Sequence, residues 1–165
     1  MTIMPTFDER FHKDLTAEDE LGAVIRAHIH IESSIIDFVR ARVHYPDDLP
    51  RLQYEARLRL ATSLGLKQEY FEGLKLIGDI RNSFSHKLDA TLTDAKINEL
   101  FSKLCDEGRE LTLTAYQMTN RHLEMTDTLP FDKLPARDRF TLIAVTLKAY
   151  VAAAAHEAVS RKCAN

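Results

Sequence analysis

The sequence contains no tryptophan, only two cysteines, five glycines and five prolines among its 165 residues. So few turn-forming residues, together with 45% hydrophobic residues, argue against a disordered or low-complexity chain and allow one core to be buried. Cys105 and Cys163 lie far apart and lack metal-ligand spacing, so we expect two free thiols in a reducing compartment. The expected organisation is a single domain over residues 1–165, with an N-terminal arm at 1–16 and a helical bundle at 17–163.

Long apolar runs and an excess of positive charge are also missing. No run approaches the roughly 20 apolar residues that a membrane span needs. Asp8, Glu9, Arg10 and Lys13 interrupt the short apolar pieces near the N-terminus, which argues against a signal peptide. The formal net charge is −3, whereas a dedicated DNA-binding domain usually carries a basic footprint. We therefore expect a cytoplasmic protein that does not contact a membrane.

The hydrophobic pattern is helical almost throughout, because apolar residues recur every three or four positions. The expected helices are Ala17–His44, Arg51–Leu64 and Gln68–Phe84, followed by one capped by Thr93, one through Leu111–Met125 and one that begins near Pro135. Thr16 is expected to cap the first helix, and Gly65 to end the second. No convincing alternation indicates a strand. The expected fold class is therefore all-α, a single-domain bundle of about six helices.

The last two expected helices carry more detailed predictions. The fifth is indicated by Leu111, Ala115, Met118, His122 and Met125, which recur at helical spacing, although its threonines weaken the prediction. A loop at Thr126–Leu134 then leads to the sixth, whose four alanines at 152–155 allow another helix to approach closely. We therefore expect the sixth helix to be central or to lie at an interface. A two-fold homodimer is the commonest symmetric assembly, and it is the one we expect here.

The most distinctive chemistry lies at the end of the third expected helix, in Arg81, Asn82 and His86. Histidine moves protons at neutral pH because its ordinary pKa is about 6.5, and arginine stabilises charge on a phosphate. Asn82 can orient either group, and the three together are suited to metal-free RNA cleavage. Five residues along a helix leave two side chains roughly 140° apart. Arg81 and His86 therefore converge only if the helix ends at Ser85–His86, or if a second subunit supplies the partner.

A purely structural role is the alternative for the same residues. Arg81 can pair with an acid on its helix while His86 binds the last carbonyl groups. His28 and Glu32 share a helix face and are expected to form a buried polar pair, with His86 as a candidate neighbour. Two such ligands do not make a closed metal site, so we expect neither a metal nor another cofactor.

One cluster of basic side chains is a candidate nucleic-acid patch. It consists of Arg40, Arg42, Arg51, Arg57 and Arg59. Acidic residues lie between these arginines, so the local field is largely cancelled. The helix expected after Gly65 carries Glu69, Glu72 and Asp79, and such a face would repel phosphate in a helix-turn-helix arrangement. We therefore expect DNA binding to be weak or to need assistance.

The arginine–asparagine–x–x–x–histidine pattern resembles the signature of HEPN domains, and its flanks narrow the resemblance to the mannitol operon repressor family of bacterial regulators. The matching segments are Leu58-Arg59-Leu60, Leu64-Gly65-Leu66, Phe71-Glu72-Gly73-Leu74, Ile77 to His86, Asp89, Leu92-Thr93-Asp94 and Ile97. The resemblance is strongest over Arg57–Leu104 and weaker over Leu21–Val43. It returns at Arg137-Asp138-Arg139-Phe140, where the last helix is expected to open.

This resemblance implies a HEPN-like bundle and, by the family name, repression of a sugar-alcohol uptake operon. Our first hypothesis is a mannitol operon repressor-like transcriptional regulator that acts mainly through a regulatory protein partner. The alternative is a HEPN-type metal-independent ribonuclease or RNA-binding toxin-like protein that uses Arg81 and His86, since HEPN dimers that cut RNA place two motifs across a cleft. Relatives in the repressor family are not generally regarded as nucleases, which favours the regulator. An interaction scaffold with a vestigial motif is a third reading.

Overall fold

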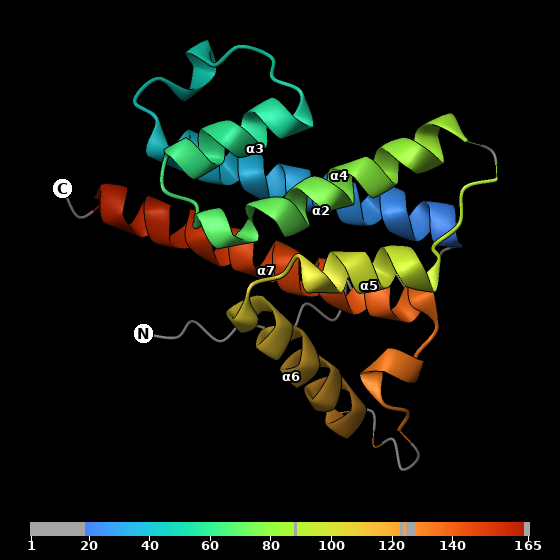
Figure 1. The fold of residues 1–165 in the computed structure, drawn as a ribbon. Coiled ribbons are helices and arrows are strands. Elements are labelled where there is room, and N and C mark those ends of the chain that lie inside the picture. Colours follow the sequence, from blue (N-terminus) through green and yellow to red (C-terminus); the bar gives the residue numbers. More distant parts are fainter. Residues whose placement is uncertain (1–18, 88, 123, 125–127, 164–165) are drawn as a thin grey trace.

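Helices form the whole regular framework of the computed structural model (Figure 1), which describes residues 19–87, 89–122, 124 and 128–163. The α-helices are α2 (Glu20–Arg42), α3 (Tyr54–Ser63), α4 (Phe71–His86), α5 (Asp94–Ser102), α6 (Asp106–His122) and α7 (Ala136–Cys163). Short 3-10 turns occur at Pro46–Asp48, Gln68–Tyr70 and Phe131–Lys133. The described residues contain no strand. The expectation of one all-α domain is confirmed, with six α-helices in the part of the chain that the structure describes.

The helix ends follow local backbone chemistry. Asp19 caps α2 by accepting a hydrogen bond of 2.7 Å from the Gly22 amide, whereas the expected cap Thr16 and the arm at 1–16 lie outside the described residues. Gly65 follows α3 with a φ of 107°, a backbone conformation that favours glycine. Thr93 caps α5 through the Lys96 amide at 3.3 Å. The two N-caps fix where α2 and α5 begin, and Gly65 fixes where the chain leaves α3.

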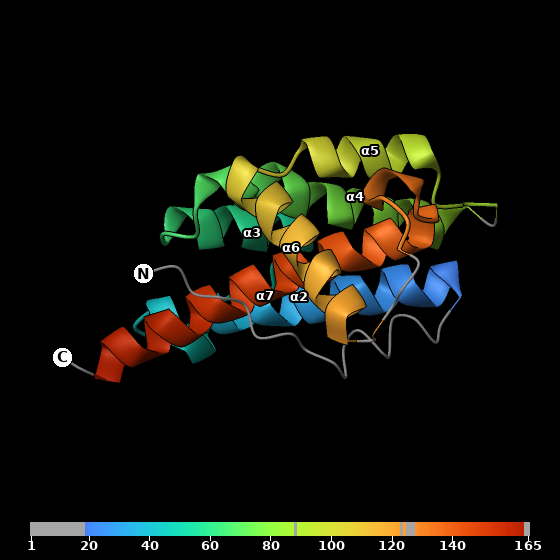
Figure 2. The ribbon, with the colours of Figure 1, turned by 90° about the horizontal axis from the view of Figure 1, so that it is seen from below.

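The most extensive helix pair is α2 with α7. Both run in the same direction, side by side, in Figures 1 and 2. Fully buried residues on the two helices are Ala23, Ala27, Ile31 and Ile35 on α2, and Phe140, Ile143, Leu147 and Val151 on α7. The interleaved alanines allow close approach. As expected, α7 is central, because it also contacts α4, α5 and α6.

Helix α7 is unusual because it is apolar on most sides. It is the one helix of the described residues that is long and apolar enough to cross a membrane, by length and composition alone. Half of its most apolar window is buried against the rest of the bundle. The sequence contains no uninterrupted apolar run of this length, because charged residues such as Arg139 and Lys148 divide the sequence of α7. The helix as a whole is nevertheless apolar on average. The Arg139 guanidinium is itself buried, and it bonds to Asn98 at 2.7 Å, to the Leu134 carbonyl and to Asp94.

Helix α6 packs against α7, and its buried face contains two threonines. The buried residues of α6 are Gly108, Thr112 and Thr119, while Met118 is 46% exposed. The threonine hydroxyls donate to carbonyls one turn earlier, at 2.8 Å for Thr112 and 2.9 Å for Thr119, so they can be buried without a lost hydrogen bond. Of the residues whose spacing predicted this helix, Leu111 and Ala115 are half-buried, Met118 and His122 are exposed, and Met125 lies outside the described residues.

A tyrosine pair connects the start of α4 with α6 and α7. The rings of Tyr70 and Tyr150 stack with centroids 3.6 Å apart, and Tyr70 is fully buried. The Tyr70 hydroxyl donates to Glu107 at 3.3 Å, and Glu107 also binds Lys67 at 2.9 Å. Burial raises the pKa of Tyr70, so the hydroxyl keeps its proton and stays a donor. The pair fixes the α3–α4 turn against the middle of the molecule.

Candidate functional site

The arginine–asparagine–histidine motif occupies the last two turns of α4, at the end of the molecule where the chain turns towards α5 (Figure 1). The helix continues through His86, and the Lys87 amide donates to the Ser83 carbonyl at 3.0 Å. Both Arg81 and His86 therefore keep helical geometry. They point in different directions, and within one chain they do not converge.

A polar pocket of about 440 Å³ lies where α2, the start of α3 and the middle of α4 meet. Its lining residues are His28, Glu32, Gln53, Tyr54, Glu55, Lys75, Gly78, Asp79, Arg81 and Asn82. The pocket thus brings the expected pair His28 and Glu32 together with Arg81 and Asn82. His86 is exposed and does not line this pocket. The candidate contact between His28 and His86 is therefore not found.

His28 is the most buried titratable group of the pocket, with 2% of its surface exposed. Its ring lies 4.5 Å from that of Tyr54, and its Nδ1 atom is 3.8 Å from the Glu32 carboxylate, too far for a hydrogen bond. Burial lowers the pKa of His28, and the charges of Arg81 and Arg57 lower it further against the opposite effect of Glu32. His28 is therefore a neutral imidazole at neutral pH.

The floor of the pocket is built by an aromatic ring that presses on a helix. The Tyr54 hydroxyl donates to the Leu74 carbonyl at 2.7 Å, and its ring covers Gly78. A Cβ atom at Gly78 would come within 2.7 Å of two ring carbons, so only glycine fits without a shift of the tyrosine. Glycine in a helix interior is thus explained by the close approach of Tyr54, and this contact sets the depth of the pocket.

Two kinds of charged group surround this floor. Glu32 forms an ion pair with Arg57, and Glu55 forms one with Arg59 at 2.6 Å. Arg81 instead donates to the Asn82 side-chain oxygen at 2.9 Å, and among the described residues it has no carboxylate partner. Asn82 therefore orients the guanidinium, one of the two roles considered for it. The expected pairing of Arg81 with an acid of its own helix does not occur within the described part of the chain.

The candidate nucleic-acid patch is engaged within the protein. Arg40 pairs with Asp47 at 2.8 Å, and the Arg42 guanidinium lies 5.4 Å from the centre of the Phe38 ring. Arg57 also donates to the Leu52 carbonyl at 2.7 Å, while Arg59 covers the Phe71 ring. Arg51 is exposed beside a smaller pocket. The patch therefore offers little uncompensated positive charge to a phosphate backbone.

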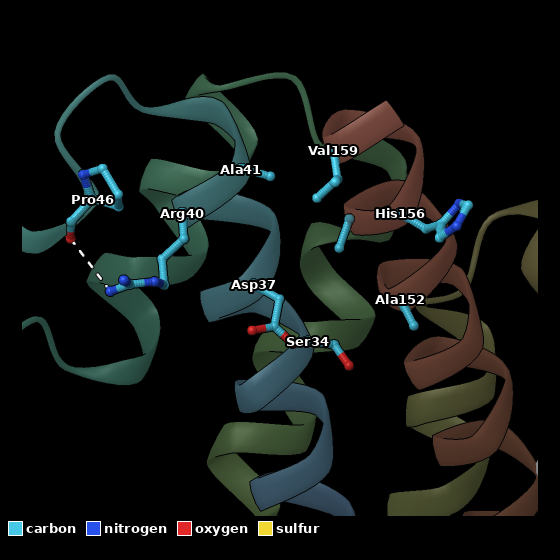
Figure 3. A pocket seen from close by; sticks show the side chains of 9 residues that line it. Ser34, Asp37, Arg40, Ala41, Pro46, Ala152, His156 and Val159 are labelled. Carbon is cyan, nitrogen blue, oxygen red and sulfur yellow. Dashed lines mark hydrogen bonds between the residues drawn. The ribbon is translucent and has the colours of Figure 1, made fainter. Parts of the chain in front are cut away.

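A second, open hollow of about 580 Å³ lies between α2 and the C-terminal half of α7 (Figure 3). Asp37 and Arg40 border it on α2, and Arg40 reaches across to the Pro46 carbonyl at 3.5 Å. The α7 side consists of Ala152, Ala155, His156 and Val159, which share one face of the helix. Val159 is half exposed there. We call this hollow the α2–α7 groove.

Among the described residues, no group of three or more histidine, cysteine, aspartate or glutamate side chains is arranged to hold a metal ion. Cys105 is a free, half-buried thiol, as expected, and the side chain of Cys163 lies outside the described residues.

Three pocket residues were not singled out from the sequence: Gln53, Tyr54 and Lys75. They come from two elements that are far from α2 in the chain, so no local spacing marks them. One signal was present. Gly78 stands inside a strongly amphipathic helix, where glycine costs about 1 kcal/mol and often indicates a close approach by another group.

The chain was compared with models of known protein families, with curated proteins and with solved structures, and none of them matches it.

Acidification is expected to weaken the fold through His28. The unfolded chain binds a proton near pH 6.5, while the folded chain resists it, so this stabilisation is complete above that pH and is lost as the pH falls through the lower folded pKa. In His28→Gln, the fall in unfolding free energy between pH 7.5 and 5.5 should shrink by up to about 1 kcal/mol, measured by urea denaturation. His86→Gln, at an exposed site, is the matched control and should behave as the parent. If the unfolding free energy of His28→Gln depends on pH as that of the parent does, His28 is not the group that weakens the fold at low pH.

Proposed function

We propose that this chain is a mannitol operon repressor-like bacterial transcriptional regulator that acts in the cytoplasm, mainly through contacts with other proteins. The observation that carries the proposal is the state of the candidate nucleic-acid patch. Three of its five arginines form ion pairs with Asp47, Glu32 and Glu55. A net charge of −3 adds no general attraction for DNA. The motif and flanking segments around Arg81 support the family through resemblance.

The exposed face of α4, the helix after the Gly65 turn, also supports the proposal. A DNA-reading helix presents basic or amide side chains on an exposed face that fits the major groove. After the Gly65 turn, the exposed positions of the next helix include Glu72 and Asp79. Such a helix is repelled by phosphate rather than steered to it. Regulation through a protein partner requires no such face.

We also propose that the working form is a homodimer joined through the α2–α7 groove. Helix α7 is apolar on most sides, yet only half of its most apolar window is buried in one chain, and a helix of this kind is normally covered. The alanines in the groove allow a second helix to pack closely. Asp37 on α2 and His156 on α7 lie on opposite sides of the groove, so a two-fold copy brings an acid towards an imidazole.

The second candidate function, a HEPN-type ribonuclease, is favoured by one observation. Asn82 holds the guanidinium of Arg81 in place, while His86 is exposed one and a half turns later at the end of the same helix. In a single chain the two groups diverge. The end of α4 lies at the other end of the molecule from the α2–α7 groove (Figure 1), so this candidate needs a different two-fold interface. Across such an axis, the His86 of one subunit can meet the Arg81 of its partner over an RNA phosphate.

The regulatory proposal predicts weak DNA binding by the purified protein. In an electrophoretic shift with the upstream region of the regulated operon, near physiological salt and with competitor DNA, the dissociation constant should be weaker than about 1 µM. Asp47→Asn combined with Glu55→Gln releases two arginines and should strengthen binding without adding sequence preference, because non-specific contacts follow charge.

The same experiment has a counterpart in cells. Deleting the gene should raise expression of a reporter fused to a sugar-alcohol uptake operon. A sequence-specific nanomolar shift by the purified protein would falsify the partner-dependent mechanism, and an unchanged reporter would remove the regulatory function itself.

The ribonuclease candidate predicts cleavage of single-stranded RNA in the presence of EDTA, with cyclic phosphate ends. Arg81→Ala and His86→Ala should each abolish cleavage, while Lys87→Ala, which removes a neighbouring exposed charge, should not. Because the site is composite, mixing the two inactive variants should restore part of the activity. Intact RNA at high concentrations of the parent protein eliminates this candidate.

The dimer predicts a mass of two chains by size-exclusion chromatography with light scattering at micromolar concentration. Val159→Arg places a charge in the α2–α7 groove and should give a monomer. Leu113→Arg changes an exposed apolar residue on α6 and should leave the dimer intact. A monomeric parent protein, or a dimeric Val159→Arg, counts against the groove as the interface.

A further inference from the structure

The polar pocket between α2, α3 and α4 has the size of a small-molecule site. Its volume of about 440 Å³ falls within the range of about 300–1,000 Å³ that is typical of ligand pockets. Three separate chain segments line it, and the Tyr54–Gly78 contact shapes its floor, so the pocket is a product of tertiary packing. Neither candidate function above requires a cavity at this place.

The charges that line the pocket are unevenly compensated. The carboxylates of Glu32 and Glu55 are already bound by arginines of α3. Lys75 and Asp79 also line the pocket, four residues apart on α4; no ion pair joins them in the described residues, but their opposite charges cancel in the charge count of the pocket. Arg81 is left without a carboxylate among the described residues. One positive charge therefore faces the pocket, and it sits on a planar fork that matches a carboxylate.

The remaining polar groups of the pocket offer both donors and acceptors. His28 makes no hydrogen bond among the described residues, although it is 98% buried and lines the pocket. A neutral imidazole donates from one nitrogen and accepts at the other. Gln53 and Asn82 supply amides, and Asp79 supplies an acceptor. Such a set pairs with hydroxyl groups, each of which both donates and accepts.

The ring of Tyr54 argues against a flat aromatic ligand. It is covered by Gly78 and contacts His28, so it offers no open platform for a nucleobase. A doubly charged phosphate monoester is also disfavoured, because the pocket has only one uncompensated positive charge and the carboxylate of Asp79 lines the same pocket as Arg81. A ligand with one negative charge and several hydroxyl groups satisfies both the charge and the hydrogen-bonding groups.

We propose that this pocket binds a small polyhydroxylated carboxylate, such as a sugar acid, with its carboxylate on Arg81 and its hydroxyl groups on His28, Asp79 and Asn82. Arg81 and Asn82 then act as ligand-binding residues in a single chain. The assignment is independent of the regulatory role, because it rests on the pocket alone. It gives the protein a metabolite-sensing site close to the end of α4.

The test is direct binding of small molecules to the purified full chain. Binding is measured by isothermal titration calorimetry and by changes in amide chemical shifts in NMR spectra. The probes are D-gluconate, D-glucose, D-glucose 6-phosphate and inorganic phosphate. Gluconate should bind most tightly and should shift amides of α2 and α4 around His28 and Arg81. Tighter binding of glucose or of either phosphate overturns the proposed ligand class, and shifts confined to other regions overturn the site.

Charge-matched variants identify the residue that carries the affinity. Arg81→Gln should weaken gluconate binding at least about tenfold, because it removes the charge and the fork. Lys87→Gln removes the same charge from a neighbouring exposed position outside the pocket and should bind as the parent does. Arg81→Lys keeps the charge without the fork and should lose affinity several-fold; it replaces Arg81→Gln if that variant fails to fold. Equal affinities in the parent, Arg81→Gln and Arg81→Lys refute the proposal.

Discussion

The packing of α2 against α7 is the contact on which the rest of the structure depends. Both helices bury alanines beside large aliphatic residues, so their axes approach closely while Ile31, Ile143 and their neighbours fill the core. The α3–α4 hairpin covers α2, while α5 and α6 lie against α7. The same small residues leave space unfilled at the edge of the pair. A hollow therefore remains where Ala152 and Ala155 face α2. The core and the α2–α7 groove thus have the same physical origin.

A second close approach shapes the polar pocket. Because Gly78 has no side chain, the Tyr54 ring lies directly on α4 and the start of α3 is drawn towards it. This contact brings Gln53 and Glu55 into the lining of the pocket that Arg81 also lines, and it places the Tyr54 ring against His28. The burial that lowers the pKa of His28 is therefore a consequence of a glycine on another helix. Stability at low pH and the chemistry of the pocket depend on the same few atoms.

Sequence periodicity was sufficient for the fold class and for most helix positions, because a stripe of apolar residues has to face a core. It failed on α6, where Thr112 and Thr119 are buried after bonding to their own helix and Met118 is exposed. Polarity scales treat a threonine hydroxyl as a group that needs water, whereas here the hydroxyl donates its hydrogen bond to a carbonyl of its own helix. The polar pocket was out of reach for another reason. Residues on three segments meet there, and single-sequence spacing contains no information about such meetings.

The arginines of this chain show why composition alone misjudges a binding surface. Arg40, Arg57 and Arg59 are all committed to carboxylates, so a cluster that looks basic in the sequence is nearly neutral in space. Arg81 shares α4 with two acids, Glu72 and Asp79, yet within the described residues it has no carboxylate partner and it lines a pocket. Electrostatic function follows from which charges remain after folding, since pairing removes most of the field of the others. By that criterion, the end of α4 is the place where this protein meets an anion.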